Sequence, residues 1–441
     1  MEPVTVGIIS IIFLLGLLGL GVSIGLAFIL VSFLGVSIIL GLNQAVSFLG
    51  ITLYHSIASP SWCSIPVFVL MGAFAVVVGF GNDIYDSVDK LTKRLPGSLG
   101  VATCLGSAIF GAISGSSLAN TAIFGKIALP EMDKYKYDRA FSVACVASAG
   151  TFANMIPPSV NMIIFCLFAE QSIGRLFAAG IIPGLITATT YIVSILWRVR
   201  KNPKLAPEDV VITKKLSRRE KMYCFQKMAP SALTILIVFS GIYSGLFTPT
   251  EAAAAGCFVI LLIGWLRKSI KGLKILTEPL KESANTTAQL FLINVSAIFF
   301  SRYFALTDIP SNLAMFVNDL AVPRIVILLF ILMVYFFLGM IMVEIGMYAL
   351  TIPIFLPIII TLGYDPIWFG IIVIKMSEIA AITPPVGLNV YMAKVVAGKD
   401  VSLEQIFGAI WPFCLCDIIV LILLVIFPEI TLWLPNLLMG H

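Results

Sequence analysis

Two Pro-Pro pairs interrupt this chain where its sequence is otherwise apolar enough to cross a lipid bilayer. They are Pro157-Pro158 and Pro384-Pro385, and the 441-residue sequence contains no others. Proline lacks a backbone donor and clashes with the preceding turn, so two in succession end a helix. In hydrocarbon the backbone groups freed by such a break need partners in the protein or a polar cavity. The sequence therefore predicts two broken membrane spans around enclosed polar space.

The composition indicates an all-α polytopic membrane protein. Apolar residues make up 59% of the chain and charged residues 12%, whereas a soluble domain carries about 25% charged residues. Apolar runs of about 20 residues, each long enough to span a bilayer, recur from end to end. These runs include Val4–Val22, Gly25–Leu42, Ile65–Phe80, Phe177–Trp197, Ala229–Phe247, Ala252–Leu266, Ala288–Phe304, Ile325–Gly339 and Ile418–Trp433.

Loop charge predicts the orientation of these spans. The stretch from Arg198 to Lys227 is the longest polar segment and is rich in Lys and Arg, so we expect it on the cytoplasmic side. No Lys or Arg precedes Lys90. The N-terminus is therefore expected on the opposite, outer side of the membrane.

The two halves of the chain share landmarks about 227 positions apart, as in an internal repeat. The Pro-Pro pairs match at this spacing, as do Gly111 with Gly339 and Phe177 with Phe407. If each half crosses the membrane an odd number of times, the second half is inserted in the opposite orientation to the first. The distribution of Lys and Arg among the loops agrees with this inverted orientation. Inverted repeats are typical of secondary transporters. An ordinary helical bundle with accidental spacing is the alternative.

A Gly/Ser segment precedes the first break and predicts a re-entrant hairpin. Its apolar flanks are each too short to span a membrane and end at like-charged loops. Ser114, Ser116, Ser117 and Asn120 offer oxygens at the tip, of the kind that a small cation such as Na⁺ prefers. A packing face of small residues between helices is the alternative. A second hairpin is expected at the matching place, with Glu344 near its tip.

Each break is expected to expose backbone carbonyls before its prolines and helix amides after them. Carbonyls suit a cation, and the positive end of a half-helix suits an anion. Asn154 and Thr383 add side-chain oxygens near the two breaks. A plain kink without a ligand is the alternative at each break.

Lys375 and Glu378 lie three residues apart in an apolar segment. A buried charge needs a partner or a water-filled cavity. The spacing allows the two side chains to pair on one helix face. Lys375 is alternatively expected to receive an anionic substrate.

Other function classes find little support in the sequence. It contains no GxxxxGK[ST] loop, its only histidines are His55 and His441, and no nucleophile–base arrangement is visible. We expect no enzyme, no organic cofactor, no metal beyond Na⁺ and no nucleic-acid partner. A membrane-embedded enzyme is the remote alternative, and it would turn over substrate without an ion gradient.

Several motifs together resemble the large membrane subunit of TRAP (tripartite ATP-independent periplasmic) transporters over essentially the whole chain. They begin at Gly111 (GAISGSS), Leu129 (LPEM), Ile156 (IPPS), Gly180 (GIIPG), Gly245 (GLFTPTEAAA) and Thr383 (TPPVGLN). The resemblance implies Na⁺ coupling and an elevator mechanism in the bacterial inner membrane, with a periplasmic N-terminus. It also implies two partners: a small four-helix membrane subunit on a separate chain, and a soluble periplasmic protein that delivers an organic acid.

The resemblance also implies site residues. One Na⁺ site would use Ser114, Ser116 or Ser117 and Asn120, with the main chain of Ala153, Asn154 and Ile156. A second would use the main chain around Glu344 and Gly346 and around Ala381 and Thr383. Substrate would lie between the hairpin tips, near Ser116, Asn120, Pro157, Pro158, Lys375, Pro384, Pro385, Gly387 and Asn389.

The chain departs from the family pattern at the second tip, where many relatives carry Asp-Pro and this chain has Val343-Glu344. This departure and Lys375 leave the substrate open between a carboxylate and a sulfonate. A stand-alone sodium/dicarboxylate carrier, which needs no binding protein, is the alternative function.

We expect the chain to divide into repeated segments. Residues 1–97 form scaffold helices and an interfacial arm, 98–170 the first transport-domain hairpin and broken helix, and 171–199 the last span of the first repeat. Residues 200–227 form the cytoplasmic basic loop. Residues 228–322, 323–398 and 399–441 repeat the first three segments in order.

Overall fold

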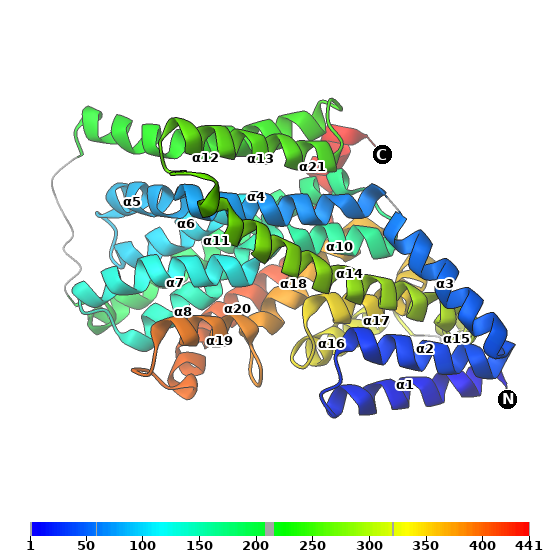
Figure 1. Ribbon diagram of the computed structural model, residues 1–441. Helices are drawn as coiled ribbons and strands as arrows, with labels where there is room; N and C mark the ends of the chain where they lie inside the picture. Colours follow the sequence, from blue (N-terminus) through cyan, green and yellow to red (C-terminus); the bar gives the residue numbers. More distant parts are fainter. Residues whose placement is uncertain (1, 59, 208–215, 320–321, 441) are drawn as a thin grey trace.

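The computed structural model describes residues 2–58, 60–207, 216–319 and 322–440, and in these ranges the chain is helical without strands (Figure 1). Part of the predicted basic loop, residues 208–215, lies outside the described residues. The helices of the first half are α1 Pro3–Gly19, α2 Ile24–Leu40, α3 Leu42–Ala58, α4 Ser64–Val78, α5 Phe80–Thr92, α6 Ser98–Ser114, α7 Ser117–Lys134, α8 Arg139–Gly150, α9 Phe152–Met155, α10 Val160–Ala169 and α11 Ile173–Lys201. Those of the second half are α12 Arg218–Tyr243, α13 Pro249–Leu266, α14 Thr277–Ala305, α15 Ile309–Asp319, α16 Arg324–Gly339, α17 Glu344–Thr361, α18 Pro366–Ile382, α19 Leu388–Ala397, α20 Leu403–Ile426 and α21 Glu429–Met439.

The helices confirm a polytopic membrane fold. Within the described residues, 7 helical stretches are long and apolar enough to cross a membrane, or up to 8 if one bent pair counts as a single span. The bent pair joins Arg139–Met155 to Val160–Ala169 at an angle of 42°. This bend coincides with the first Pro-Pro pair. Both Pro-Pro peptide bonds are cis.

The order of helices repeats between the halves. The pair α1–α2 corresponds to α12–α13, the hairpin α6–α7 to α16–α17, and the broken span α8–α10 to α18–α19. In Figure 1, α1–α2 and α12–α13 lie on opposite outer faces of the bundle, and the two hairpins lie toward opposite ends. This arrangement supports the inverted repeat that the landmarks indicate.

The predicted interfacial arms differ between the halves. The first arm is the separate helix α3, which begins after Gly41, whose φ is 98°. The second arm, expected within residues 228–322, is instead a short 3-10 turn, Leu273–Leu276, followed by the beginning of α14. Pro279 lies in the first turn of α14, where backbone N–H groups have no acceptor within the helix. The missing N–H of this proline therefore costs no hydrogen bond, and the helix continues to Ala305.

The predicted last span, residues 399–441, contains two helices rather than one. Helix α20 ends at Ile426, and Pro428 lies between it and α21. Helix α21 folds back against α11, so the end of the chain covers the last span of the first repeat.

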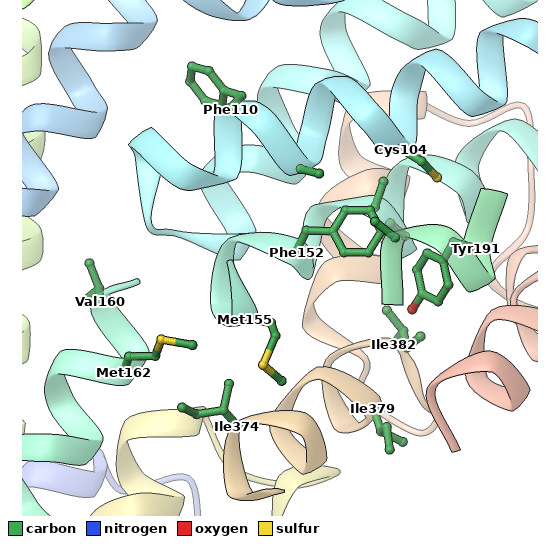
Figure 2. Close-up of a cluster of buried hydrophobic side chains, with 14 of the residues drawn as sticks. Cys104, Phe110, Phe152, Met155, Val160, Met162, Tyr191, Ile374, Ile379 and Ile382 are labelled. Carbon is green, nitrogen blue, oxygen red and sulfur yellow. The ribbon is translucent and has the colours of Figure 1, made fainter. Parts of the chain in front are cut away.

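Apolar side chains of the broken spans form the centre of the core. In Figure 2, Phe152 points toward Tyr191. Helix α9, which carries Phe152 and Met155, packs against α18. The rings of Phe152 and Tyr191 have centroids 5.2 Å apart, and these side chains are fully buried. The breaks are therefore held by packing between α9, α11 and α18.

Candidate binding site

A central cavity of about 500 Å³ lies where the hairpins and the broken spans meet. The first hairpin contributes Ser114–Ala119, and the second contributes Val343–Ile345. Val160 and Asn161 line it after the first break, and Leu388 and Asn389 after the second. The opposite wall comes from α4 and α14. The cavity thus joins elements of both repeats.

Glycines let the first hairpin approach the first break closely. A Cβ placed on Gly111 would lie 3.1 Å from the backbone of Ala153, and one on Gly115 would lie 3.0 Å from the carbonyl oxygen of Pro158. Gly115 has a φ of 61°, which favours glycine. Its carbonyl accepts a 3.1 Å hydrogen bond from the N–H of Val160. The hairpin tip is therefore bonded to the half-helix that follows the break.

Four buried oxygens of the first hairpin and the first broken span have no hydrogen-bond partner among the described residues. Asn120 is fully buried, and its Nδ2 donates to the carbonyls of Ser107 at 3.1 Å and Gly150 at 3.4 Å. Its Oδ1 has no hydrogen-bond partner among the described residues, and the same holds for the hydroxyls of Ser114, Thr121 and Ser148. Buried polar oxygens are rarely left unpaired. This set is suited to a small cation.

At the matching place in the second half, the side-chain oxygens of Glu344 and Ser377 are already hydrogen-bonded. A small cavity of about 50 Å³ lies between the second hairpin and α18, lined by Gly339, Ser377, Ala380, Ala381 and Gly387 among others. The Thr383 hydroxyl donates to the carbonyl of Ile379 at 2.6 Å. A ligand here would depend largely on main-chain carbonyls.

Glu344 connects the second hairpin to the first broken span. Its carboxylate accepts a 2.7 Å hydrogen bond from Asn154 Nδ2 and another from Asn161 Nδ2. The Nδ2 of Asn161 also donates to Asn154 Oδ1 at 2.9 Å. Hydrogen bonds to an ionised carboxylate are stronger than neutral ones. The two repeats are thus joined at the edge of the central cavity.

Helix ends of both signs surround this space. Helices α7, α10, α17 and α19 begin at residues that line the central cavity. Helices α6 and α16 end at residues that line the central and the small cavity, respectively. A helix N-terminus carries about half an elementary positive charge and a C-terminus the opposite. Anions and cations are both favoured here.

The structure brings together only part of the predicted site. The central cavity is lined by Ser114, Ser116, Ser117, Glu344, Ala381 and Asn389, and the small cavity by Glu344, Ala381 and Gly387. Predicted residues that line neither of these two cavities are Asn120, Ala153, Asn154, Ile156, Pro157, Pro158, Gly346, Lys375, Thr383, Pro384 and Pro385. Of these, Gly346 faces Ile24 of α2. Asn120 and Asn154 lie one layer behind the wall.

Lys375 is buried and paired, which matches one of the two sequence-based alternatives. Its Nζ lies 2.8 Å from Glu378 Oε2 and 2.7 Å from Asp417 Oδ1. Its geometry gives no support to a substrate contact. Asp417 was missed because it lies 42 residues away in sequence, on α20.

Other cavity residues also escaped the sequence analysis. Glu282, Thr286 and Gln289 form a polar face on α14, and Lys126 lines the cavity from α7. The spacing of the α14 residues places them on one helix face, which is a signal that the sequence contains. No sequence pattern marks Asn161 as a site residue, because its role depends on its contact with Glu344, which is distant in the chain.

The comparisons with known proteins agree on a class of transporter. The family model described as "Tripartite ATP-independent periplasmic transporter, DctM component" matches residues 11–430. The C4-dicarboxylate TRAP transporter large permease DctM of Pseudomonas aeruginosa is 33% identical over 402 residues, covering 91% of this chain and 92% of that protein. The sialic acid TRAP transporter large permease SiaM of Vibrio cholerae is 31% identical, covering 97% and 98%.

A solved structure shares the fold at low sequence identity. The crystal structure of the YdaH transporter of Alcanivorax borkumensis matches with a TM-score of 0.62 at 14% identity, covering 89% of this chain and 90% of that one.

Proposed function

This chain belongs to the DctM family of tripartite ATP-independent periplasmic transporters, and we propose that it carries a small organic anion into the cell together with Na⁺. The anion is a carboxylate or a sulfonate. One observation carries the proposal: α7, α10, α17 and α19 all begin at the same cavity. Their N-termini favour an anion without requiring a dedicated arginine.

Na⁺ is the proposed coupling ion. The unpartnered oxygens of Ser114, Asn120, Thr121 and Ser148 support one Na⁺ site in the first half. The main chain around the small cavity, at Gly339, Ala381 and Gly387, supports a second. A cation in either place offsets the negative charge of a nearby cargo, so each ligand favours binding of the other.

We further propose an elevator mechanism in the bacterial inner membrane, with the N-terminus in the periplasm. The hairpins and broken spans would move as one body against α4 and α14. Gly72 of α4 supports this division, because a Cβ there would lie 2.7 Å from the carbonyl oxygen of Ser114 at the hairpin tip. A surface without side chains allows one body to pass closely along another.

The proposed partners are a small four-helix membrane subunit on a separate chain and a periplasmic substrate-binding protein. Exposed apolar side chains on α1 and α2, such as Ile8, Ile12, Leu26 and Ile38, offer a surface for lipid or for a membrane partner. The alternative, a stand-alone sodium/dicarboxylate carrier, uses the same cavity without a delivery protein.

Uptake into proteoliposomes tests the proposal. A thermal-shift screen of the proposed periplasmic binding protein first identifies the anion, and the labelled anion is then supplied outside liposomes. We expect uptake only with the binding protein, the small subunit and an inward Na⁺ gradient. Equal uptake by this chain alone would establish the stand-alone carrier. Equal uptake with choline in place of Na⁺ would exclude Na⁺ coupling.

A further inference from the structure

A buried ionic cluster lies outside both cavities and has no part in the function proposed above. It consists of Lys375 and Glu378 on α18 and Asp417 on α20, and the side chains are 0% exposed. Thr187 of α11 accepts a hydrogen bond from Lys375, and Tyr191 of α11 donates one to Asp417. The cluster therefore joins the second broken span to the last span of each repeat.

The charges of this cluster do not balance. One ammonium group faces two carboxyl groups, so full ionisation leaves one negative charge without a counterion. A charge taken out of water without a counterion is costly, and buried groups exchange protons to avoid it. A further positive charge, either a proton or a metal cation, is needed.

Hydrogen bonding distinguishes the two acids. Both oxygens of Asp417 are used: Oδ1 accepts from Lys375 Nζ at 2.7 Å, and Oδ2 accepts from the Tyr191 hydroxyl at 2.7 Å. Glu378 uses only Oε2, which accepts from Lys375 Nζ at 2.8 Å. Its Oε1 is buried and has no partner among the described residues. An unpartnered oxygen is far less costly on a neutral acid than on an anion.

We propose that this cluster is a proton-binding site and that Glu378 holds the proton on Oε1. A proton fits better than Na⁺, because Na⁺ requires several oxygens and space. Glu378 lines neither the central nor the small cavity.

The surroundings add further acids. Two arginines on helices packed against α18 lie over aromatic rings, Arg198 over Phe413 and Arg324 over Tyr364. The other titratable groups recorded around α18 on these helices are Tyr191 on α11, Tyr335 on α16, Glu344 and Tyr348 on α17, and Cys414, Cys416 and Asp417 on α20. Each of these carries either no charge or a negative one. They favour the neutral form of Glu378.

The site lies one residue along α18 from the small cavity. Ser377, which precedes Glu378, lines that cavity, and its hydroxyl is hydrogen-bonded to the Tyr348 hydroxyl at 2.9 Å. A ligand that moves α18 at the small cavity therefore also moves the cluster. A proton held at Glu378 is placed to be carried or released when that ligand binds.

Infrared spectroscopy of the full chain in lipid nanodiscs at neutral pH tests the proposal through the C=O stretch of protonated carboxyl groups. We expect a band that Glu378→Gln removes and that the control Glu404→Gln keeps, since Glu404 is exposed and lines neither of the two cavities. Asp417→Asn should also remove the band, because Glu378 then becomes the only counterion of Lys375.

Two results would overturn the proposal. A band left unchanged by Glu378→Gln would mean that Glu378 is ionised. A band that appears only after choline replaces Na⁺ would assign the missing charge to Na⁺. If Glu378→Gln does not fold, unmodified protein labelled with ¹³C-glutamate keeps the test decisive: the band must shift with the label and must disappear in Asp417→Asn.

Discussion

The two broken spans have similar backbones but different surroundings. Both contain a cis Pro-Pro bond followed by a helix of 10 residues. Pro157 and Pro158 are buried, whereas Pro384 and Pro385 are exposed. Ser159 caps α10 by accepting from the N–H of Met162, whereas α19 begins after Gly387 without a side-chain cap.

The buried polar groups differ as well. Ser148 and Thr151 lie in the first broken span about 227 positions before Lys375 and Glu378. The first half therefore buries hydroxyls where the second half buries charges. The repeat preserves the path of the main chain, while each half carries its own chemistry.

The largest expected effect comes from Lys375→Met, which tests the charged half. It leaves two buried acids without their ammonium partner, so we expect a loss of about 3–5 kcal/mol of stability. Thermal unfolding of the purified chain measures this loss. The matched change in the other half, Ser148→Ala, should stay within about 1 kcal/mol of the unmodified protein.

A combined variant sharpens this prediction. Lys375→Met with Glu378→Gln and Asp417→Asn replaces all three ionisable side chains by neutral ones and should recover most of the loss. If Lys375→Met and Ser148→Ala lowered the stability by equal amounts, the two halves would not differ in the energetic importance of these buried polar groups.

Asn120→Ala tests the oxygen-rich site of the first half. It removes the unpartnered Oδ1 and the donor to Ser107 and Gly150, so we expect Na⁺ to bind about tenfold more weakly. The readout is the rise in unfolding temperature with Na⁺ concentration, against choline. Ser142→Ala is the control, because the Ser142 hydroxyl already donates a hydrogen bond to the Asp138 carbonyl and is not one of the unpartnered oxygens. Superimposable Na⁺ titrations of Asn120→Ala and the unmodified chain would remove Asn120 from the site.

Glu344→Gln tests the connection between the halves. Its carboxylate accepts from Asn154 and Asn161, and a carboxamide offers only one oxygen to these donors. A double-mutant cycle with Asn161→Ala should give a coupling of about 1–2 kcal/mol in thermal unfolding. Strict additivity of the two changes would show that this contact does not hold the repeats together.

Thr383→Ala should have the smallest effect. Its hydroxyl donates to Ile379, and main-chain carbonyls dominate the second site, so we expect Na⁺ to bind only about two- to threefold more weakly. The Na⁺ titration used for Asn120→Ala measures it. A tenfold loss would mean that both halves bind Na⁺ through side chains, and the contrast between them would fail.

The sequence predicted what depends on local backbone chemistry. Pro157-Pro158 and Pro384-Pro385 indicated the breaks, and the Gly111–Asn120 segment indicated the first hairpin. The pairing of Lys375 with Glu378 was one of two alternatives that the sequence left open, and their spacing on one helix face allowed it. Each of these features involves residues close together in the chain.

Contacts between distant residues were beyond such prediction. Asp417 joins the cluster only because α20 packs against α18, and Asn161 meets Glu344 only because the two repeats interlock. The exposure of Pro384 and the burial of Pro157 likewise depend on which helices cover each break. The specific Na⁺ and substrate residues remain predictions.

The hairpins lie toward opposite ends of the bundle and meet at the central cavity. A solute in the cavity therefore touches both hairpins. The position of the first hairpin depends on the close glycine contacts at Gly111 and Gly115, and that of the second on the hydrogen bonds of Glu344. A change at either set of contacts would alter one wall of the cavity while leaving the other in place.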